Sequence, residues 1–317
     1  GEIIALGAML DYVYTTQSGL LPPLHLPNRE LSAKIMLIDQ ATIKNLEIYE
    51  TLNNEKEGSL INALDYTNTS AGSRLLLNDL LAPLKDLDLI NDRLALVDFF
   101  FKNNLKSQKI RKILKQTPDF SRSMSRLGVR RGGPRDLLAL LRGLKNSKIL
   151  KNIIFEMLES EVIIEPVKIF LKELKFEEEI LNLLESSMEE EVPLNARDGN
   201  FIRKGFDIEL DKIRNIKESS KRSIIELEKI ERESTKINSL KIKYNNVLGF
   251  FIDITSSNKK YIDGNQNYIH RQTLMNSVRY TTTELADLSD KILNSTERSI
   301  NLELSLFEKL VQSILNY

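Results

Sequence analysis

The feature that most constrains the fold is a strand-like stretch, LKIKYNNVLGFFIDIT (240–255), placed between two long helical patterns. Apolar residues recur at helical spacing from Asp207 to Ile237 and again from Thr283 to Leu315. At a rise of 1.5 Å per residue, the first pattern predicts a helix about 45 Å long. We therefore expect an antiparallel helix pair with a small sheet at its tip. The alternative is an unrelated helix pair around an ordinary α+β domain.

The strand-like stretch alternates as an antiparallel hairpin does. In chain order it begins with Leu240, Lys241, Ile242, Lys243, Tyr244 and Asn245. Side chains of a strand point alternately to opposite faces, so this order predicts an apolar face turned inward and a basic, hydrogen-bonding face turned outward. Asn245 and Asn246 supply turn residues that tolerate positive φ, and Gly249 predicts a bulge or a close backbone approach.

Donor side chains gather in this stretch and in the sequence that follows it, which includes YIHRQTLMNSVRYTTTEL (268–285). Long basic side chains with Asn and Gln suit phosphate contacts, which give affinity and register without reading sequence. The residues that we expect to contact a phosphate backbone are Lys241, Lys243, Asn245, Asn246, Lys259, Lys260, His270, Arg271, Gln272 and Arg279. The alternative is that Lys and Arg here only keep a small sheet soluble and protect its edges.

The chain before residue 175 is predicted to be a helical bundle. From Ser59 to Lys175, successive segments place apolar residues at positions i, i+3 and i+4. Asp88 is the expected N-cap of one helix, and Pro134 is the expected first-turn proline of another. Residues 3–16 also form a helical pattern, whereas IMLIDQATIKN (35–45) is apolar and β-branched and predicts a short edge strand or turn.

The composition excludes several kinds of site. The 317 residues include no Cys and only two His, so disulfides, a zinc cluster or a Ser/His/Asp triad are not expected. No apolar run approaches the roughly 20 residues that span a bilayer. The segment GVRRGGPR (128–135) has the glycine spacing of a phosphate loop, but it lacks the Lys-Ser/Thr ending and a preceding strand. We therefore expect no catalytic, cofactor or metal site in this chain.

A net charge of zero conceals basic and acidic sections. Residues 109–135 contain nine Lys or Arg and one acid, and residues 236–283 contain seven Lys or Arg and two acids. Such sections are typical of a protein that contacts polyanions at particular places. For 109–135 we favour another interpretation, in which the arginines of a helical core pair with nearby acids.

The order of several segments resembles the family of MutS proteins of DNA mismatch repair. The similar segments are MLIDQATIKNLEI (36–48), GSLINALDYTNTSAGSRLLLNDLLAPL (58–84), INDRLALVDFF (90–100), PDFSRSMSRL (118–127), PRDLLALLRGL (134–144), DGNFIRKGFDIELDKIR (198–214), SLKIKYNNVLGFFIDIT (239–255) and YIHRQTLMNSVRYTTTEL (268–285). They cover essentially the whole chain. Two local departures are LGFF, where an aromatic Tyr pair is commoner, and ESTKI, where the family usually has a Thr-Gly turn.

The resemblance implies a mainly α fold, in which a helical core bundle has two long antiparallel lever helices that carry a small antiparallel β clamp domain at the tip. It assigns residues 1–205 to the core and lever domain. Residues 206–283 would be the descending lever helix with the inserted clamp domain, and residues 284–317 the returning lever helix. The chain begins inside an apolar helical pattern, so we expect a fragment without the mismatch-reading, connector and ATPase domains of the family.

The resemblance also implies a function, which is a non-catalytic clamping and lever module. Its clamp would contact double-stranded DNA without sequence readout, and its levers would couple the clamp to an ATPase domain. ATP, Mg, mismatched DNA, a homodimer partner and a MutL-type protein are expected only for the full-length parent, in the bacterial cytoplasm near the nucleoid. The alternatives are the shorter MutS-related paralogue that acts on recombination intermediates, and a helical scaffold whose tip binds an acidic protein.

Overall fold

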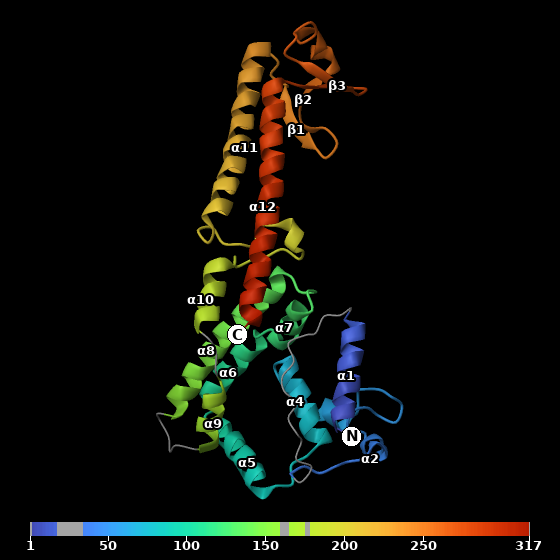
Figure 1. Ribbon diagram of the computed structural model, residues 1–317, viewed down its shortest axis with the longest axis vertical. Helices are drawn as coiled ribbons and strands as arrows, with labels where there is room; N and C mark the ends of the chain where they lie inside the picture. The colour runs from blue at the N-terminus through green and yellow to red at the C-terminus, as the bar shows by residue number, and fades with distance from the viewer. Residues whose placement is uncertain (1, 18–33, 159–164, 175–177, 317) are drawn as a thin grey trace. The chain divides into compact units, whose positions relative to one another are not determined.

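The computed structural model describes residues 2–17, 34–158, 165–174 and 178–316 (Figure 1). The α-helices are α1 Glu2–Thr16, α2 Gln40–Asn45, α3 Leu60–Leu64, α4 Ser70–Leu81, α5 Leu87–Lys102, α6 Asn104–Lys115, α7 Phe120–Gly128, α8 Pro134–Leu158, α9 Glu165–Glu173, α10 Glu178–Ser187, α11 Ile208–Thr235 and α12 Thr283–Leu315. The strands and 3-10 helices are η1 Ala196–Asp198, β1 Lys241–Asn245, β2 Gly249–Thr255, η2 Ser256–Tyr261, β3 Ile269–Thr273 and β4 Ser277–Thr281. The fold is mainly α with one small antiparallel sheet, as predicted.

The chain divides into two compact units. Unit 1 contains Gly1–Leu194 and Leu310–Tyr317, and unit 2 contains Asn195–Lys309. Helix α12 contributes its last turns to unit 1 and the rest of its length to unit 2.

Helix α8 organises unit 1, because α6, α7, α9 and α10 all pack against it. One apolar cluster joins α8 to α5, α6 and α9 through residues such as Phe99, Ile110 and Ile154. On α7, Phe120 packs so close to Gly143 that a Cβ at residue 143 would lie 2.6 Å from its ring. Pro134 is the first residue of α8, as predicted.

Two predictions for unit 1 are wrong. Helix α5 is capped by Asp86, whose side chain accepts from the Leu89 N–H, and Asp88 lies in the first turn instead. The segment 35–45 is mostly not a strand. Only Ile35 makes an isolated β-bridge, and Asp39 caps the short helix α2 by accepting from the Thr42 N–H. Local side-chain caps override weak β-branched propensity in so short a segment.

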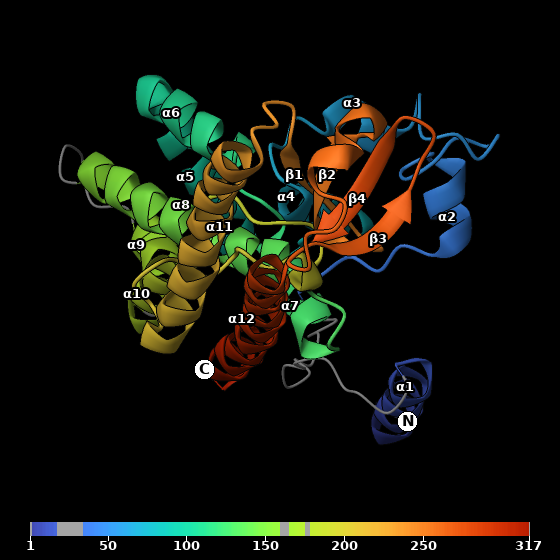
Figure 2. The ribbon, with the colours of Figure 1, turned by 90° about the horizontal axis from the view of Figure 1, so that it is seen from above.

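Unit 2 contains a four-stranded antiparallel sheet in the order β1-β2-β4-β3 (Figure 2). Ile242 pairs with Ile252, and Ile252 pairs with Tyr280. A register shift between His270 and Gln272 makes a bulge in the edge strand β3. The predicted hairpin of residues 240–255 is therefore the β1–β2 half of the sheet.

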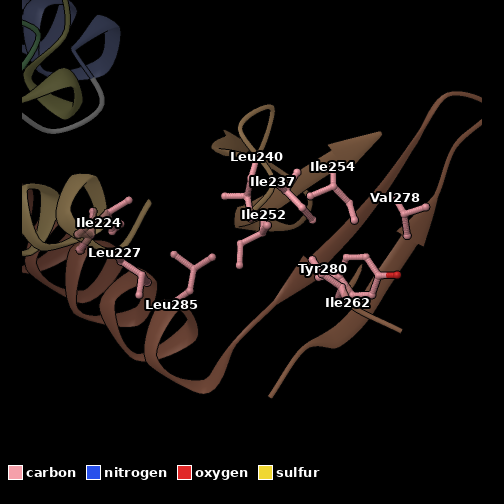
Figure 3. Close-up of a cluster of buried hydrophobic side chains, with 11 residues drawn as sticks. Ile224, Leu227, Ile237, Leu240, Ile252, Ile254, Ile262, Val278, Tyr280 and Leu285 are labelled. Carbon is pink, nitrogen blue, oxygen red and sulfur yellow. The ribbon is translucent and has the colours of Figure 1, made fainter. Parts of the chain in front are cut away.

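One face of the sheet packs on the two long helices, as Figure 3 shows. The cluster is formed by Ile224, Leu227, Ile237, Leu240, Ile252, Ile254, Ile262, Val278, Tyr280, Leu285 and Ile292. Tyr244, which the alternation placed on the inward face, is instead 51% exposed and packs on Phe250 at 5.1 Å between ring centroids. It lies at the end of the edge strand β1, beyond the members of the cluster.

The other end of the helix pair is held by a buried ion pair. Arg214 of α11 donates to Glu303 of α12 at 2.9 Å, and the Glu303 side chain is 1% exposed. Glu303 also accepts from the N–H of Phe201, and Arg214 also donates to the carbonyl of Ile202. Because Arg214 contacts Glu303 while Leu227 shares a cluster with Leu285, α11 and α12 are antiparallel within unit 2.

Candidate nucleic-acid interface

The sheet has a row of polar side chains on the face opposite the apolar cluster. In the strand register Lys241 lies opposite Asp253, which lies opposite Arg279. Arg279 in turn lies opposite Gln272. Directly opposed residues point to the same side of a sheet. Three predicted contact residues, from β1, β4 and β3, therefore share one row with a carboxylate between them.

Lys243 lies on the same face, but its charge is already paired. Its Nζ is 2.6 Å from Asp253 Oδ2, and the Asp253 side chain is only 14% exposed. For Lys241 the structure gives no carboxylate within ion-pair distance among the described residues. Lys241 is thus the more available of the two cations for an external anion.

Arg279 is held in a fixed orientation. Its guanidinium carbon lies 4.5 Å from the ring centroid of Phe251, and its Nη1 donates to Gln272 Oε1 at 2.7 Å. Its Nε is buried without a hydrogen-bond partner in the described structure. In the sequence Phe251 stands out only as part of LGFF, with no role on the polar face. Its position in the strand was the available signal, because Phe251 is two residues from Asp253 and therefore points to the same, otherwise polar face. An aromatic ring there can stack against a cation.

The edge strand β3 is exposed along its whole length. Arg271 occupies the bulge between His270 and Gln272, with no ion pair among the described residues. The His270 Nε2 and the Thr273 Oγ1 are 2.8 Å apart, and the His270 ring meets the Tyr280 ring edge-on. Arg271 is therefore a free cation at the edge, whereas His270 is engaged within the sheet.

The lysines of η2 lie beyond the end of β2. Lys259 Nζ is 3.7 Å from Asp263, and Lys260 Nζ lies 5.1 Å from the Tyr261 ring centroid. The N–H of Ser256 donates to the carbonyl of Asn276, so η2 begins beside the β3–β4 turn.

Asn245 and Asn246 lie at the opposite end of the sheet from η2, because their turn precedes β2 and η2 follows it. The turn follows directly at 246–248, as predicted, although neither Asn adopts the positive φ that it tolerates. Instead Asn245 Oδ1 accepts from two N–H groups of the turn, those of Val247 and Leu248. Gly249 takes the positive φ of 70°, and a Cβ there would lie 3.1 Å from Ser289 Oγ, which confirms the predicted close approach. The ten predicted residues do not form a single cluster.

Directional bonds fix the sheet to α11. Glu228 accepts from the N–H of Ile242 at 2.7 Å, and Arg232 Nε donates to the carbonyl of Leu240 at 2.7 Å. The hydroxyl of Tyr268 donates to Glu231, and burial together with that carboxylate raises the pKa of Tyr268. The first two bonds close the outer edge of β1 and the third holds the chain before β3, so the polar face of the sheet has a defined orientation on the helix.

The interpretation that the arginines of segment 109–135 pair with nearby acids holds for Arg126 alone among the residues that the structure describes. Its single acid, Asp119, binds Arg74 with two hydrogen bonds of 2.7 and 3.1 Å. No other described Lys or Arg of the segment makes an ion pair, and Arg126 pairs with Asp136 of α8 at 3.4 Å. The pairing fails because α6 and α7 contain no acid, and Glu178 and Glu185 of α10 pair with Lys148 and Lys145 of α8 instead.

Comparison with known proteins assigns the family. In the described part of the chain no helix has both the length and the apolarity to cross a membrane. A family model described as MutS domain III matches residues 41–317. Proteins named DNA mismatch repair protein MutS from Bartonella tribocorum, Rhizobium meliloti and Ruegeria pomeroyi are each 39% identical over 99% of this chain. The chain spans 34%, 34% and 36% of their lengths, respectively. The chain therefore belongs to the MutS family, and the matched region is its domain III.

Proposed function

We propose that this chain is the DNA-contacting lever module of a MutS-type mismatch-repair protein. The observation that carries the proposal is the polar face of the unit 2 sheet. Its cations come from different strands, and the opposite face is fixed to two long helices. Lys241 and Arg271 have no ion pair among the described residues, and Arg279 is oriented by Phe251 and Gln272. Charges presented on a rigid support suit contacts to a phosphate backbone.

The proposal includes the coupling role of the two helices. In it, residues 206–283 form the descending lever and clamp, residues 284–317 form the returning lever, and residues 1–205 form the core. The relatives are named for DNA mismatch repair, which supports duplex DNA as the ligand. ATP hydrolysis, Mg, dimer formation and a MutL-type partner would belong to the full-length parent, with this chain contributing no catalytic group.

The test removes three cations of the polar face and its surroundings, which are Lys241, Lys260 and Arg271, by changing each to Gln. The matched control changes three exposed cations of α11, Lys212, Lys229 and Arg222, to Gln. DNA affinity is measured by fluorescence anisotropy with labelled duplexes, with and without a mismatch, over a range of salt concentrations.

We expect the triple variant to lose at least about tenfold in affinity at low salt for both duplexes, and its salt slope to fall by about 2 to 3. The control should stay close to the unchanged protein. Equal losses in the two triple variants would refute the site. An effect limited to the mismatched duplex would refute backbone binding without sequence readout. High affinity for an acidic protein and none for DNA would favour the scaffold alternative.

A further inference from the structure

Helices α6 and α7 of unit 1 carry a basic surface that the function proposed for the unit 2 sheet does not account for. Together they contain seven Lys or Arg and no Asp or Glu. Helix α11 also contains seven Lys or Arg, but these alternate with seven acids and form ion pairs such as Arg232–Glu228. The contrast separates an ordinary solvated helix face from one whose positive charge is mostly not compensated within the described structure.

We define the basic strip as the exposed cations of these two helices, which are Lys109, Arg111, Lys112, Lys115, Arg122 and Arg126. Apart from Arg126, none of them has an ion-pair partner among the residues that the structure describes. Both helices pack on α8 through buried residues, Ile110 on α6 and Leu127 on α7. The cations therefore lie on the sides of α6 and α7 that face solvent within unit 1.

Helix stability accounts for only part of the strip. Lys112, Lys115 and Arg126 lie in last turns, where a cation interacts favourably with the helix dipole by about 0.3 to 1 kcal/mol. That effect does not apply to Lys109 or Arg111 in the middle of α6. It is unfavourable for Arg122, which lies in the first turn of α7. Some of these charges thus serve no evident purpose in the fold.

The chemistry of the strip favours a nucleic acid over a protein partner. The other exposed side chains between 106 and 126 are small or polar, Gln108, Gln116, Ser121 and Ser125, with the sole large apolar exception of Phe120 at 37% exposure. Protein interfaces have buried aromatic and aliphatic anchors and are depleted in Lys. Phosphate contacts, in contrast, use Lys, Arg, Ser and Gln side chains.

A cavity of about 600 Å³ borders the basic strip at Lys115, but its other lining residues are not members of the strip. Lys115 lines it together with Arg135 and Arg142, but Glu190 and Glu191 line it as well. Carboxylates in a hollow repel a polyanion, whereas α6 and α7 contain none, and Asp119, which caps α7, is already bound by Arg74. The exposed helix faces are therefore the favoured surface.

From this arrangement we propose that the basic strip is a second contact surface for the backbone of duplex DNA, independent of the unit 2 sheet. The proposal takes from the proposed function only that duplex DNA is the ligand. The strip would add non-specific, salt-sensitive affinity, because each phosphate that it neutralises releases counterions.

The test changes four residues of the strip, Lys109, Arg111, Lys112 and Arg122, to Gln, which has nearly the helix propensity of Lys and Arg. A control with the same change in charge replaces four exposed lysines of unit 1 outside the strip by Gln, namely Lys44, Lys56, Lys85 and Lys172. Circular dichroism verifies folding, and anisotropy with a labelled duplex gives affinity against salt.

We expect the strip variant to bind at least about tenfold more weakly at low salt, with a salt slope lower by about 2 to 4, and the control to change by less than about threefold. A photo-crosslinking residue in place of Gln108 should label the duplex, whereas one in place of Glu173 on α9 should not. Equal affinities of the strip and control variants, or no crosslink from residue 108, would overturn the proposal.

The two DNA surfaces are separable in the same assay. If the triple variant of the sheet loses affinity and the strip variant does not, the strip is not a DNA surface and the proposed function stands. If the strip variant alone loses affinity, the sheet assignment fails and the strip is supported. Additive losses in a combined variant would support both surfaces.

Discussion

The two ends of the α11–α12 pair in unit 2 are held together by opposite kinds of interaction. At the sheet end, eleven buried residues, all apolar apart from the hydroxyl of Tyr280, join the helices to the strands. At the other end, Arg214, Glu303 and the backbone of residues 201 and 202 form a buried polar cluster. Apolar packing is non-directional and tolerates volume-conserving changes, whereas a buried ion pair requires its partners in one geometry.

The two ends therefore make different contributions to the structure of the helix pair. An apolar cluster supplies stability roughly in proportion to the area that it buries. A buried ion pair contributes little net stability, but removing one partner leaves an uncompensated charge. We therefore interpret the Arg214–Glu303 end as the part that fixes the register of the two helices, and the sheet end as the part that holds them together.

The largest expected effect comes from breaking the polar end. Glu303→Ala should lower the free energy of unfolding by about 3 to 5 kcal/mol, because Arg214 and the Phe201 N–H lose their partner. Denaturant unfolding followed by circular dichroism measures this loss. Hydrogen exchange at the Phe201 amide should become faster. Glu297→Ala, at an exposed position of the same helix, is the control and should change stability by no more than about 0.5 kcal/mol.

A double variant tests whether the ion pair fixes register or supplies stability. Arg214→Met with Glu303→Met removes both charges and should regain most of the stability that Glu303→Ala loses. A double variant as unstable as the single one would show that the pair itself is strongly stabilising, and would remove the contrast between the two ends.

The next effect comes from the apolar end. Ile252 is fully buried in the centre of the sheet, so Ile252→Ala should cost about 2 to 4 kcal/mol, and Ile252→Val only about 0.5 to 1.5 kcal/mol. Such a graded response is the signature of packing. At the polar end even the nearly isosteric Glu303→Gln should cost more than Ile252→Val, because it removes the charge that Arg214 requires. The opposite order would contradict our division of the helix pair.

How far the sequence predicts these features depends on the range of the interactions. Both long helices and the hairpin at 240–255 follow from local periodicity, which the chain itself displays. The Arg214–Glu303 pair joins positions 89 residues apart, and no local pattern marks Glu303 as buried. On the sheet, alternation predicts which residues share a face. It does not predict that Asp253 takes the charge of Lys243, because that depends on how the strands align.

The smallest effect concerns the backbone where α11 ends. Lys236 adopts a left-handed conformation with φ of 56° immediately before Ile237, a member of the apolar cluster. That conformation costs a non-glycine residue about 1 to 2 kcal/mol, part of which Lys236→Gly should recover, although glycine loses more entropy on folding. We expect a net gain of about 0.5 to 1 kcal/mol in urea unfolding.

A second glycine variant is the control for the expected gain in stability. Lys229→Gly, at an exposed position inside α11, should lose about 1 kcal/mol, because glycine disfavours a helix interior. If both glycine variants are destabilised, Lys236 is not strained, and the apolar end is not weakened by its backbone. If Lys236→Gly is stabilised and Lys229→Gly is destabilised, the backbone at Lys236 is strained in the folded protein. The apolar cluster and the hydrogen bonds between the sheet and α11 then do not remove that strain. The side chains of the cluster would then contribute more stability than the intact protein reveals, because part of their contribution offsets the strain at Lys236.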